Sequence, residues 1–146
     1  MLPTIKTDQR VLSYNDHLQL SALRYYKSGN STDILNLAYD YGVNNNGQIQ
    51  AMRYYTSPNV EDSAKSEYFS YDQYTRLSAA HTGTFNSSTP GTWSLTWGYD
   101  RFGNRLQQNL VGGNTSGTSI GQSQLTVDPN TNRVTNAGFI MTPQAM

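Results

Sequence analysis

A tyrosine-aspartate pair recurs along this chain at a nearly fixed spacing, and it limits the possible folds more than any other feature. Asp72, Asp100 and Asp128 are 28 residues apart, twice in succession, and Asp40 lies 32 residues before Asp72. A period of roughly 20 to 50 residues is typical of repeat architectures, in which each unit is one supersecondary structure. We therefore expect a repeat protein.

The clearest copy, residues 95–106, predicts a β-hairpin. Leucine, tryptophan and tyrosine alternate with threonine and glycine before the turn, as in a half-buried strand. Asp100 can accept hydrogen bonds from backbone N–H groups of the turn, and Gly103 can take the positive φ angle that follows a type I turn. In this register Asp100 faces Asn104, and Tyr99 faces Arg105, on which its ring can stack.

Two further copies keep most of this pattern. Tyr71-Asp72 is followed by Thr75 in the place of Gly103. Val127-Asp128 is followed by Pro129, whose fixed φ angle suits the second position of a turn. We expect all of these turn residues to be structural.

Two upstream copies are less regular. Tyr39-Asp40 opens a longer loop that ends at Asn46-Gly47, a pair favoured in hairpin turns. Residues 14–18 form a degraded first copy. The chain is thus predicted to be all-β, a single segment over 1–146 of four to five consecutive antiparallel hairpins centred near Tyr14, Tyr39-Asp40, Tyr71-Asp72, Tyr99-Asp100 and Val127-Asp128.

The order of apolar and turn residues predicts the strands and loops. Strands are expected at 11–14, 18–26, 34–41, 48–55, 67–71, 76–80, 95–99, 123–127 and 133–136, with a return strand from 105 and a further strand at 139–141. Residues 56–66 and 81–92 are expected to be loops, and 112–118 a flexible linker.

The Tyr-Asp-x-x-Gly-Asn/Arg pattern, followed by arginine or leucine and repeated about every 28 residues, resembles the YD repeat of bacterial Rhs proteins and of teneurins. The resemblance runs from roughly Tyr14 to Met146. It implies a strip of β-hairpins that spirals into the wall of a large hollow shell, which in the family encloses a toxic or otherwise cleaved C-terminal segment. The partners it implies are neighbouring YD repeats of the same longer chain and an enclosed polypeptide cargo. The implied location is secreted or at the cell surface, as part of a larger protein.

Composition and charge narrow the function classes. The chain has 11 tyrosines, only 14% charged residues and a net charge of zero, as expected for polar, sheet-forming repeats. This charge leaves no basic surface for nucleic acid. No apolar run is long enough for a membrane helix, and no signal peptide is visible at the N-terminus.

The inventory of reactive side chains does not predict an enzyme. His17 and His81 are the only histidines and there is no cysteine, so a zinc centre lacks ligands. No Gly-x-Ser-x-Gly motif is present to hold a nucleophilic serine. We expect no catalytic residue, no cofactor and no metal.

A calcium loop is the nearest alternative to a metal-free chain. Asp128, Asn130 and Asn132 place oxygen atoms at positions 1, 3 and 5 of such a loop. However, Arg133 and Phe139 stand where calcium loops need glycine and glutamate. A plain proline turn is therefore the favoured interpretation of this segment.

The aromatic residues Trp93, Trp97, Tyr99 and Phe102 leave a second function open. They could stack on sugars, although packing within the sheet is the favoured interpretation. The sequence thus predicts a non-catalytic structural segment of the wall of a large Rhs-like protein. The alternative is a carbohydrate- or cell-surface-binding module that uses exposed tryptophan and tyrosine.

Overall fold

The structure, a computed structural model, describes residues 8–27, 32–57, 60–84, 91–112 and 123–135. Within these ranges the regular structure is entirely β, which confirms the predicted fold class. The strands are β1 (Asp8–Tyr14), β2 (Leu20–Lys27), β3 (Thr32–Asp40), β4 (Ala51–Ser57), β5 (Val60–Glu61), β6 (Glu67–Tyr71), β7 (Leu77–Thr82), β8 (Ser94–Tyr99), β9 (Arg105–Gly112), β10 (Ser123–Gln124), β11 (Val127–Asp128) and β12 (Arg133–Val134).

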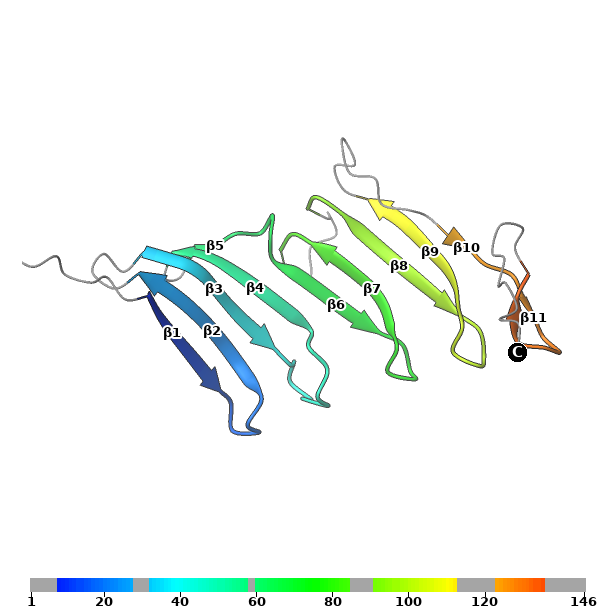
Figure 1. Ribbon diagram of the computed structural model, residues 1–146, viewed down its shortest axis with the longest axis horizontal. Helices are drawn as coiled ribbons and strands as arrows, with labels where there is room; N and C mark the ends of the chain where they lie inside the picture. Colours follow the sequence, from blue (N-terminus) through cyan, green and yellow to red (C-terminus); the bar gives the residue numbers. More distant parts are fainter. Residues whose placement is uncertain (1–7, 28–31, 58–59, 85–90, 113–122, 136–146) are drawn as a thin grey trace, which may run out of the picture.

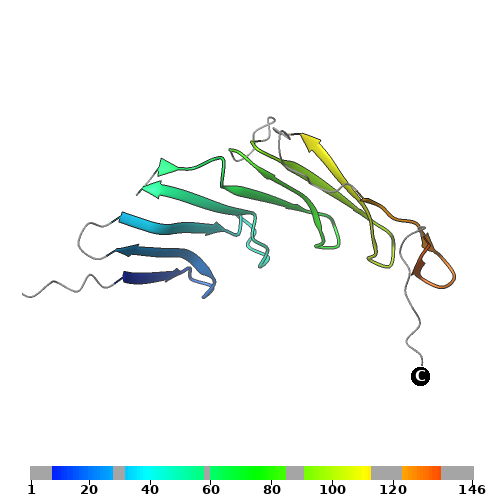
Figure 2. The same cartoon turned by 45° about the horizontal axis from the view of Figure 1, so that its top comes forward.

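Successive strands pair side by side in a single antiparallel meander. A ten-stranded sheet has the order β1-β2-β3-β4-β6-β7-β8-β9-β10, with β5 paired to β4, and β11 and β12 form a separate two-stranded sheet. Figure 1 shows a one-layered strip whose hairpin turns lie along a common edge, and Figure 2 shows that the strip twists along its length. We number the hairpins in chain order: hairpin 1 is β1–β2, hairpin 2 is β3–β4, hairpin 3 is β6–β7, hairpin 4 is β8–β9 and hairpin 5 is β11–β12.

The register of hairpin 4 agrees with the sequence prediction. Tyr99 is the cross-strand partner of Arg105, the Asp100 N–H donates to the Asn104 carbonyl at 3.0 Å, and Gly103 has a φ angle of +90°. The sequence pattern therefore predicts the cross-strand pairing and the left-handed position of this turn correctly.

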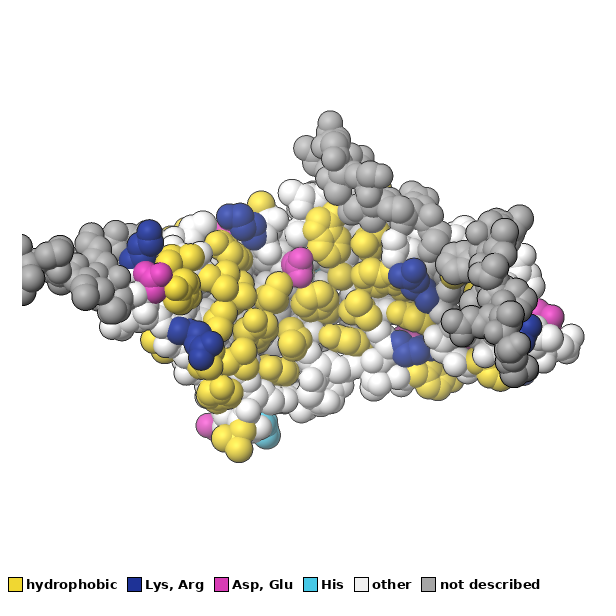
Figure 3. All heavy atoms as spheres, viewed as in Figure 1, with side chains coloured by type: hydrophobic (Ala, Val, Ile, Leu, Met, Phe, Trp, Pro, Cys, Tyr) yellow, Lys and Arg dark blue, Asp and Glu magenta, His cyan; other side chains and the backbone are white. Residues whose placement is uncertain are grey.

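The two faces of the sheet differ in character, because cross-strand partners share a face and neighbours along a strand alternate. The apolar face holds the rows Leu12, Leu23, Leu37, Tyr54 and Phe69, Ala80, Leu95, Leu110. The opposite face holds the rows Ser13, Ala22, Ala38, Arg53 and Ser70, Ala79, Thr96, Asn109. Figure 3 shows one broad face on which hydrophobic side chains gather across many strands.

Few side chains are fully buried, because the described strip has no second layer. Ala51, Tyr68 and Ala80 are the buried apolar residues of the described part, with exposures of 0%, 3% and 2%, and Ser66 and Thr82 are buried with them. Most domains bury a sheet face against another layer. Stability here must come mainly from the contacts between neighbouring hairpins.

Several strand boundaries differ from the prediction. Leu18 does not begin the return strand of hairpin 1: it lies in the turn with a φ angle of +60°, and β2 starts at Leu20. The predicted loop 56–66 contains β5, and its backbone then turns around Asp62, whose carbonyl accepts the Ser66 N–H at 2.9 Å. The approach to hairpin 5 is split, because Ser123–Gln124 pairs with β9 whereas Val127–Asp128 pairs with β12. Residues 113–118 of the predicted linker and the predicted strand 139–141 lie outside the described residues.

Candidate functional site

The aspartate that opens each turn organises its backbone. In hairpin 4, Asp100 Oδ1 accepts the N–H groups of Phe102 at 2.8 Å and Asn104 at 2.9 Å. The Asn104 side-chain amide donates to Oδ2 at 2.8 Å, and the Gly103 N–H donates to the Asp100 carbonyl at 3.2 Å. The side-chain bond from Asn104 and the backbone bonds lower the pKa of Asp100, although desolvation partly opposes them.

Hairpin 3 has the same arrangement with a charged partner. Asp72 Oδ1 accepts the N–H groups of Tyr74 and Arg76, both at 2.9 Å, and Oδ2 pairs with the Arg76 guanidinium at 2.7 Å. Desolvation of Asp72 acts to raise its pKa, but the hydrogen bonds and the charge of Arg76 outweigh it and the pKa is lowered. Thr75 takes the left-handed conformation that Gly103 takes in hairpin 4, with a φ angle of +65°.

Hairpin 1 places an amide in the position of the aspartate. Asn15 Oδ1 accepts the N–H groups of His17 and Gln19, both at 3.0 Å. The amide oxygen therefore replaces the carboxylate oxygen in this turn. The sequence signal was present in Tyr14-Asn15, since asparagine and aspartate share this turn chemistry.

Hairpins 2 and 5 have longer turns that keep part of the arrangement. Asp40 Oδ1 accepts the Gly42 N–H at 2.8 Å, and Oδ2 pairs with Arg53 at 3.1 Å. Asp128 Oδ1 accepts the Asn130 N–H at 2.8 Å, and the Asn132 N–H donates to the Asp128 carbonyl at 2.8 Å. The exposed Pro129 lies at the second position of this turn.

In the segment considered for calcium, the side-chain oxygens of Asp128 and Asn132 accept hydrogen bonds from other groups of the protein. Asp128 Oδ1 binds the Asn130 N–H, and Asn132 Oδ1 accepts the Asn104 amide at 2.6 Å. The Asn130 N–H bond is the main reason that the pKa of Asp128 is lowered. These contacts account for two of the three side chains that would form the calcium loop.

Three tyrosine hydroxyls tie hairpins 2, 3 and 4 each to the hairpin before it. We call them the tyrosine ties. Each donates to a carbonyl near the start of the preceding return strand: Tyr41 to Leu20 at 3.0 Å, Tyr71 to Ile49 at 2.8 Å and Tyr99 to Leu77 at 2.7 Å. In hairpin 2 the tie is Tyr41, which follows the turn aspartate Asp40, and not Tyr39, which precedes it.

The predicted stacking of Tyr99 on Arg105 is wrong, although the register is right. The guanidinium over the Tyr99 ring belongs to Arg76, 4.7 Å from the ring centroid, and Arg105 Nη1 donates to Gln108 at 3.0 Å. Arg76 is already directed toward hairpin 4, because Asp72 holds one side of its guanidinium and Nη1 donates to the Asp100 carbonyl at 2.9 Å. A pattern within one hairpin could not reveal this contact between hairpins.

Side chains at the turns form a second series of contacts, which we call the turn ladder. The side chains of Asn45 and Gln19 join hairpins 1 and 2 at 2.8 Å, and Gln48 donates to the Thr75 carbonyl at 3.2 Å. The Arg76 bond to the Asp100 carbonyl and the Asn104–Asn132 bond continue the series. All five turns are therefore joined along one edge of the strip.

The aromatic residues considered for sugar binding are largely engaged within the sheet. Trp97 Nε1 donates to Gln108 Oε1 at 2.9 Å, and Trp97 and Tyr99 are both half-buried. The half-buried Trp93 precedes β8, and its backbone is paired with Thr82. Phe102, which is 55% exposed at the turn, has the Arg101 guanidinium over its ring at 4.5 Å. The structure does not arrange these four rings as one free platform.

The phenol of Tyr68 lies at the junction of hairpins 2 and 3, and the residue is only 3% exposed. It donates to Glu61 at 2.6 Å, and its ring stacks on His81 with 5.4 Å between centroids. Burial, and then the bond to Glu61, raise the pKa of Tyr68 to about 12. This phenol stays protonated at neutral pH and acts as a hydrogen-bond donor.

The described residues form neither a metal centre nor a membrane-spanning helix. No group of three or more histidine, cysteine, aspartate or glutamate side chains is placed to hold a metal ion. None of the described segments forms a helix long and apolar enough to cross a membrane.

Comparison with solved structures identifies the architecture. The fold is similar to a chain in the Tc holotoxin pore of Photorhabdus luminescens, with a TM-score of 0.66 and 16% identity over 88% of this chain and 7% of that one. It is similar to a chain in a TcdB2–TccC3 crystal structure, with a TM-score of 0.66 and 17% identity over 87% of this chain and 7% of that one. This chain thus spans a small part of the length of these toxin chains. The resemblance to YD-repeat proteins is confirmed at the level of the fold.

Comparison of sequences adds no relative. No protein-family model matches the chain, and no curated protein matches it.

Proposed function

We propose that residues 1–146 are one structural, non-catalytic segment of four to five YD units in the wall of a large Rhs-like shell. The observation that carries the proposal is that the recurrent residues form structural contacts within each hairpin and between neighbouring hairpins. The turn aspartates hold their own turns, while the tyrosine ties and the turn ladder hold the next hairpin. These contacts extend a sheet by one hairpin at a time, which is what a wall requires.

The first strand supports continuation of the wall. Tyr14 occupies the position of Tyr71 and Tyr99, directly before the residue that opens the turn, but it is 57% exposed and all seven residues of β1 are exposed. A preceding hairpin would offer Tyr14 the carbonyl that Leu77 offers Tyr99. The partner that this edge fits is therefore another YD hairpin, which we propose belongs to the same longer chain.

The resemblance to Rhs proteins, in which the shell encloses a C-terminal segment, supports a proposal for what such a wall would surround. This chain covers 7% of the length of each similar chain, as expected for one segment of a large shell. We propose that the complete protein is secreted or displayed at the cell surface and encloses a polypeptide cargo.

The side-chain chemistry supports a structural role. The turn carboxylates accept backbone N–H groups, and Tyr68 has a pKa raised to about 12, which suits neither a base nor a nucleophile at neutral pH. No observation in the described part favours the alternative of carbohydrate binding, because Trp97 and Tyr99 direct their polar atoms into the sheet.

The test begins with the reading frame that surrounds this sequence. Further Tyr-Asp units at a similar spacing are expected on both sides. In the complete protein, the segment that follows the repeats should resist protease while the shell is intact and become digestible once the shell is unfolded. A frame without further repeats, or a following segment that is digested at once in the native protein, would refute the proposal.

A further inference from the structure

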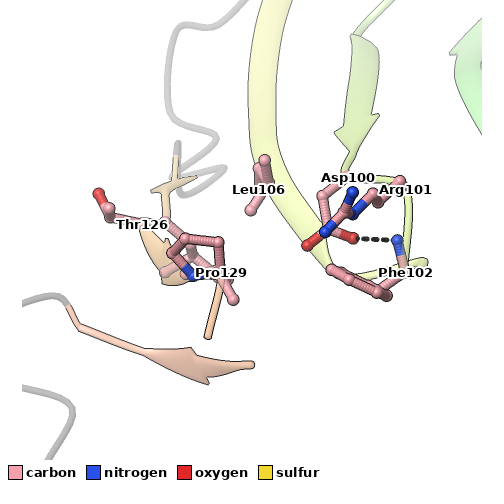
Figure 4. Close-up of a pocket in the computed structure, with 8 residues that line it drawn as sticks. Asp100, Arg101, Phe102, Leu106, Thr126 and Pro129 are labelled. Atoms are coloured by element: carbon pink, nitrogen blue, oxygen red, sulfur yellow. Dashed lines mark hydrogen bonds between the residues drawn. The ribbon is translucent and has the colours of Figure 1, made fainter. Parts of the chain in front are cut away.

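The junction of hairpins 4 and 5 contains a hollow of about 480 Å³. The junctions between the preceding hairpins indicate which kind of side chain would fill it. Its walls come from the turn of hairpin 4, from β9 and from the chain around β11. Figure 4 shows Phe102 and Leu106 on one side and Thr126 and Pro129 on the other. Leu125 and Val127 complete the apolar lining.

The hollow occupies the place of a tyrosine tie. The Phe69 N–H donates to the Gln50 carbonyl at 2.9 Å, and two residues later Tyr71 reaches Ile49, the residue before Gln50. In the same way, the Leu125 N–H donates to the Leu106 carbonyl at 2.6 Å. Two residues after Leu125, Val127 stands at the position that corresponds to Tyr71. The carbonyl that corresponds to that of Ile49 belongs to Arg105, the residue before Leu106.

Two large groups are replaced by small ones at this junction. Between hairpins 3 and 4, the Arg76 guanidinium lies on the Tyr99 ring. Counted from the turn aspartates, the corresponding residues at the next junction are Asn104 and Val127. Asn104 still reaches hairpin 5 through Asn132, but valine has neither the ring nor the hydroxyl of tyrosine. Among the described residues, the space between the two hairpins therefore stays open.

We propose that this hollow binds the tyrosine side chain of a partner polypeptide. Its ring would lie among Leu106, Leu125 and Val127, and its hydroxyl would donate to the Arg105 carbonyl, as Tyr99 donates to Leu77. The phenol chemistry follows from the three ties that fill the equivalent places. All 11 tyrosines of the chain lie within the described residues, and none of them lines the hollow.

The test uses the full chain and saturation-transfer NMR, which tolerates large assemblies. Transfer to 4-methylphenol and to N-acetyl-tyrosinamide is expected, with toluene binding roughly fivefold more weakly because it lacks a hydroxyl worth about 1 kcal/mol. Val127→Tyr should fill the hollow and abolish transfer to both phenols. Val43→Tyr is the matched control: Val43 is fully exposed in another loop, and transfer should persist.

Four outcomes would overturn the proposal. These are equal binding of toluene and 4-methylphenol, unchanged binding in Val127→Tyr, binding of 4-methylphenol without N-acetyl-tyrosinamide, and phenol binding that appears only after residues 136–146 are removed. The last would mean that the chain's own C-terminal residues occupy the hollow. Failure here leaves the wall proposal standing, because that proposal depends on the other junctions and on the flanking reading frame.

Discussion

At the residue scale, one oxygen atom at the start of each turn decides the local backbone. In hairpins 1, 3 and 4 the same oxygen accepts N–H groups two and four residues further on, whether it belongs to Asn15, Asp72 or Asp100. An oxygen acceptor of the right length is therefore enough to form the turn. The carboxylate adds a dependence on pH.

Acid should weaken the sheet through these turns. Asp72, Asp100 and Asp128 have pKa values lowered from the ordinary 3.8. A lowered folded pKa gives stability that is present above the unfolded pKa and is lost as the pH falls through the folded pKa. Urea midpoints should therefore fall as the pH drops below about 4. Asp100→Asn should reduce this dependence, because Asn15 shows that an amide can form the turn. Asp16→Asn, at an exposed turn position, should leave the dependence unchanged, and an equal effect of both variants would contradict the assignment.

The left-handed position of the turn makes a second prediction at this scale. Gly103 and Thr75 have φ angles of +90° and +65°, a region in which a β-branched residue is strained. Gly103→Val should destabilise the chain by more than about 1 kcal/mol, whereas Thr75→Gly should be neutral or stabilising. A Cβ added at Gly103 meets no atom within 4 Å, so the cost reports backbone strain and not a clash. Urea midpoints that move in the opposite order would contradict the turn assignment.

At the scale of the element, the hairpin is held by contacts that lie outside it. Tyr99→Phe removes the hydroxyl that reaches Leu77 but keeps the ring beneath Arg76. We expect a loss of about 1 kcal/mol in the free energy of unfolding. Tyr74→Phe is the control, because this ring is 67% exposed at a turn, and it should change stability by less. Equal midpoints for Tyr99→Phe and the unmodified chain would show that the tie contributes nothing.

The junction of hairpins 2 and 3 depends on a serine. The ladder between β4 and β6 has only two partner pairs, and the fully buried Ser66 continues it by accepting the Tyr54 N–H at 3.0 Å and donating to the Asp62 carbonyl at 3.1 Å. Ser66→Ala should cost about 1 kcal/mol or more, because it removes the acceptor of the half-buried Tyr54 N–H. Ser63→Ala, at an exposed position of the same loop, should be nearly neutral in denaturant titrations. A similar loss in both variants would point to the loop backbone instead.

Local chemistry explains which elements the sequence could predict. Turns and strands were predictable where the signal lay within one hairpin, as at Asp100 and Gly103. Contacts between hairpins were missed, because Tyr41 and Arg76 each bond to a backbone carbonyl more than 20 residues away. Every residue has a backbone carbonyl, so the sequence does not indicate which one is the acceptor. The hollow beside Val127 was missed for the same reason: the absence of a tyrosine there has meaning only once the other ties are known.

At the scale of the whole molecule, a one-layered sheet leaves its faces and edges to be covered by something else. Most residues of the apolar rows are only half-buried, and the β1 edge presents Val11, Leu12 and Tyr14 with exposures of 45%, 38% and 57%. Exposed strand edges recruit other chains. Repeat proteins normally end in atypical polar units that prevent this.

Association of the isolated chain follows from this edge. Expressed alone, residues 1–146 should form a soluble oligomer or an aggregate, and one further Tyr-Asp hairpin at each end should reduce association by pairing the edges. Leu12→Lys, which places a charge on the exposed edge strand, should also reduce it. Val43→Lys adds the same charge at a loop position that is fully exposed, and it should leave association unchanged. Light scattering across a range of protein concentrations measures all four. A sharply melting monomer of the unmodified chain at high concentration would mean that the hairpins close on themselves, and the open wall would be wrong.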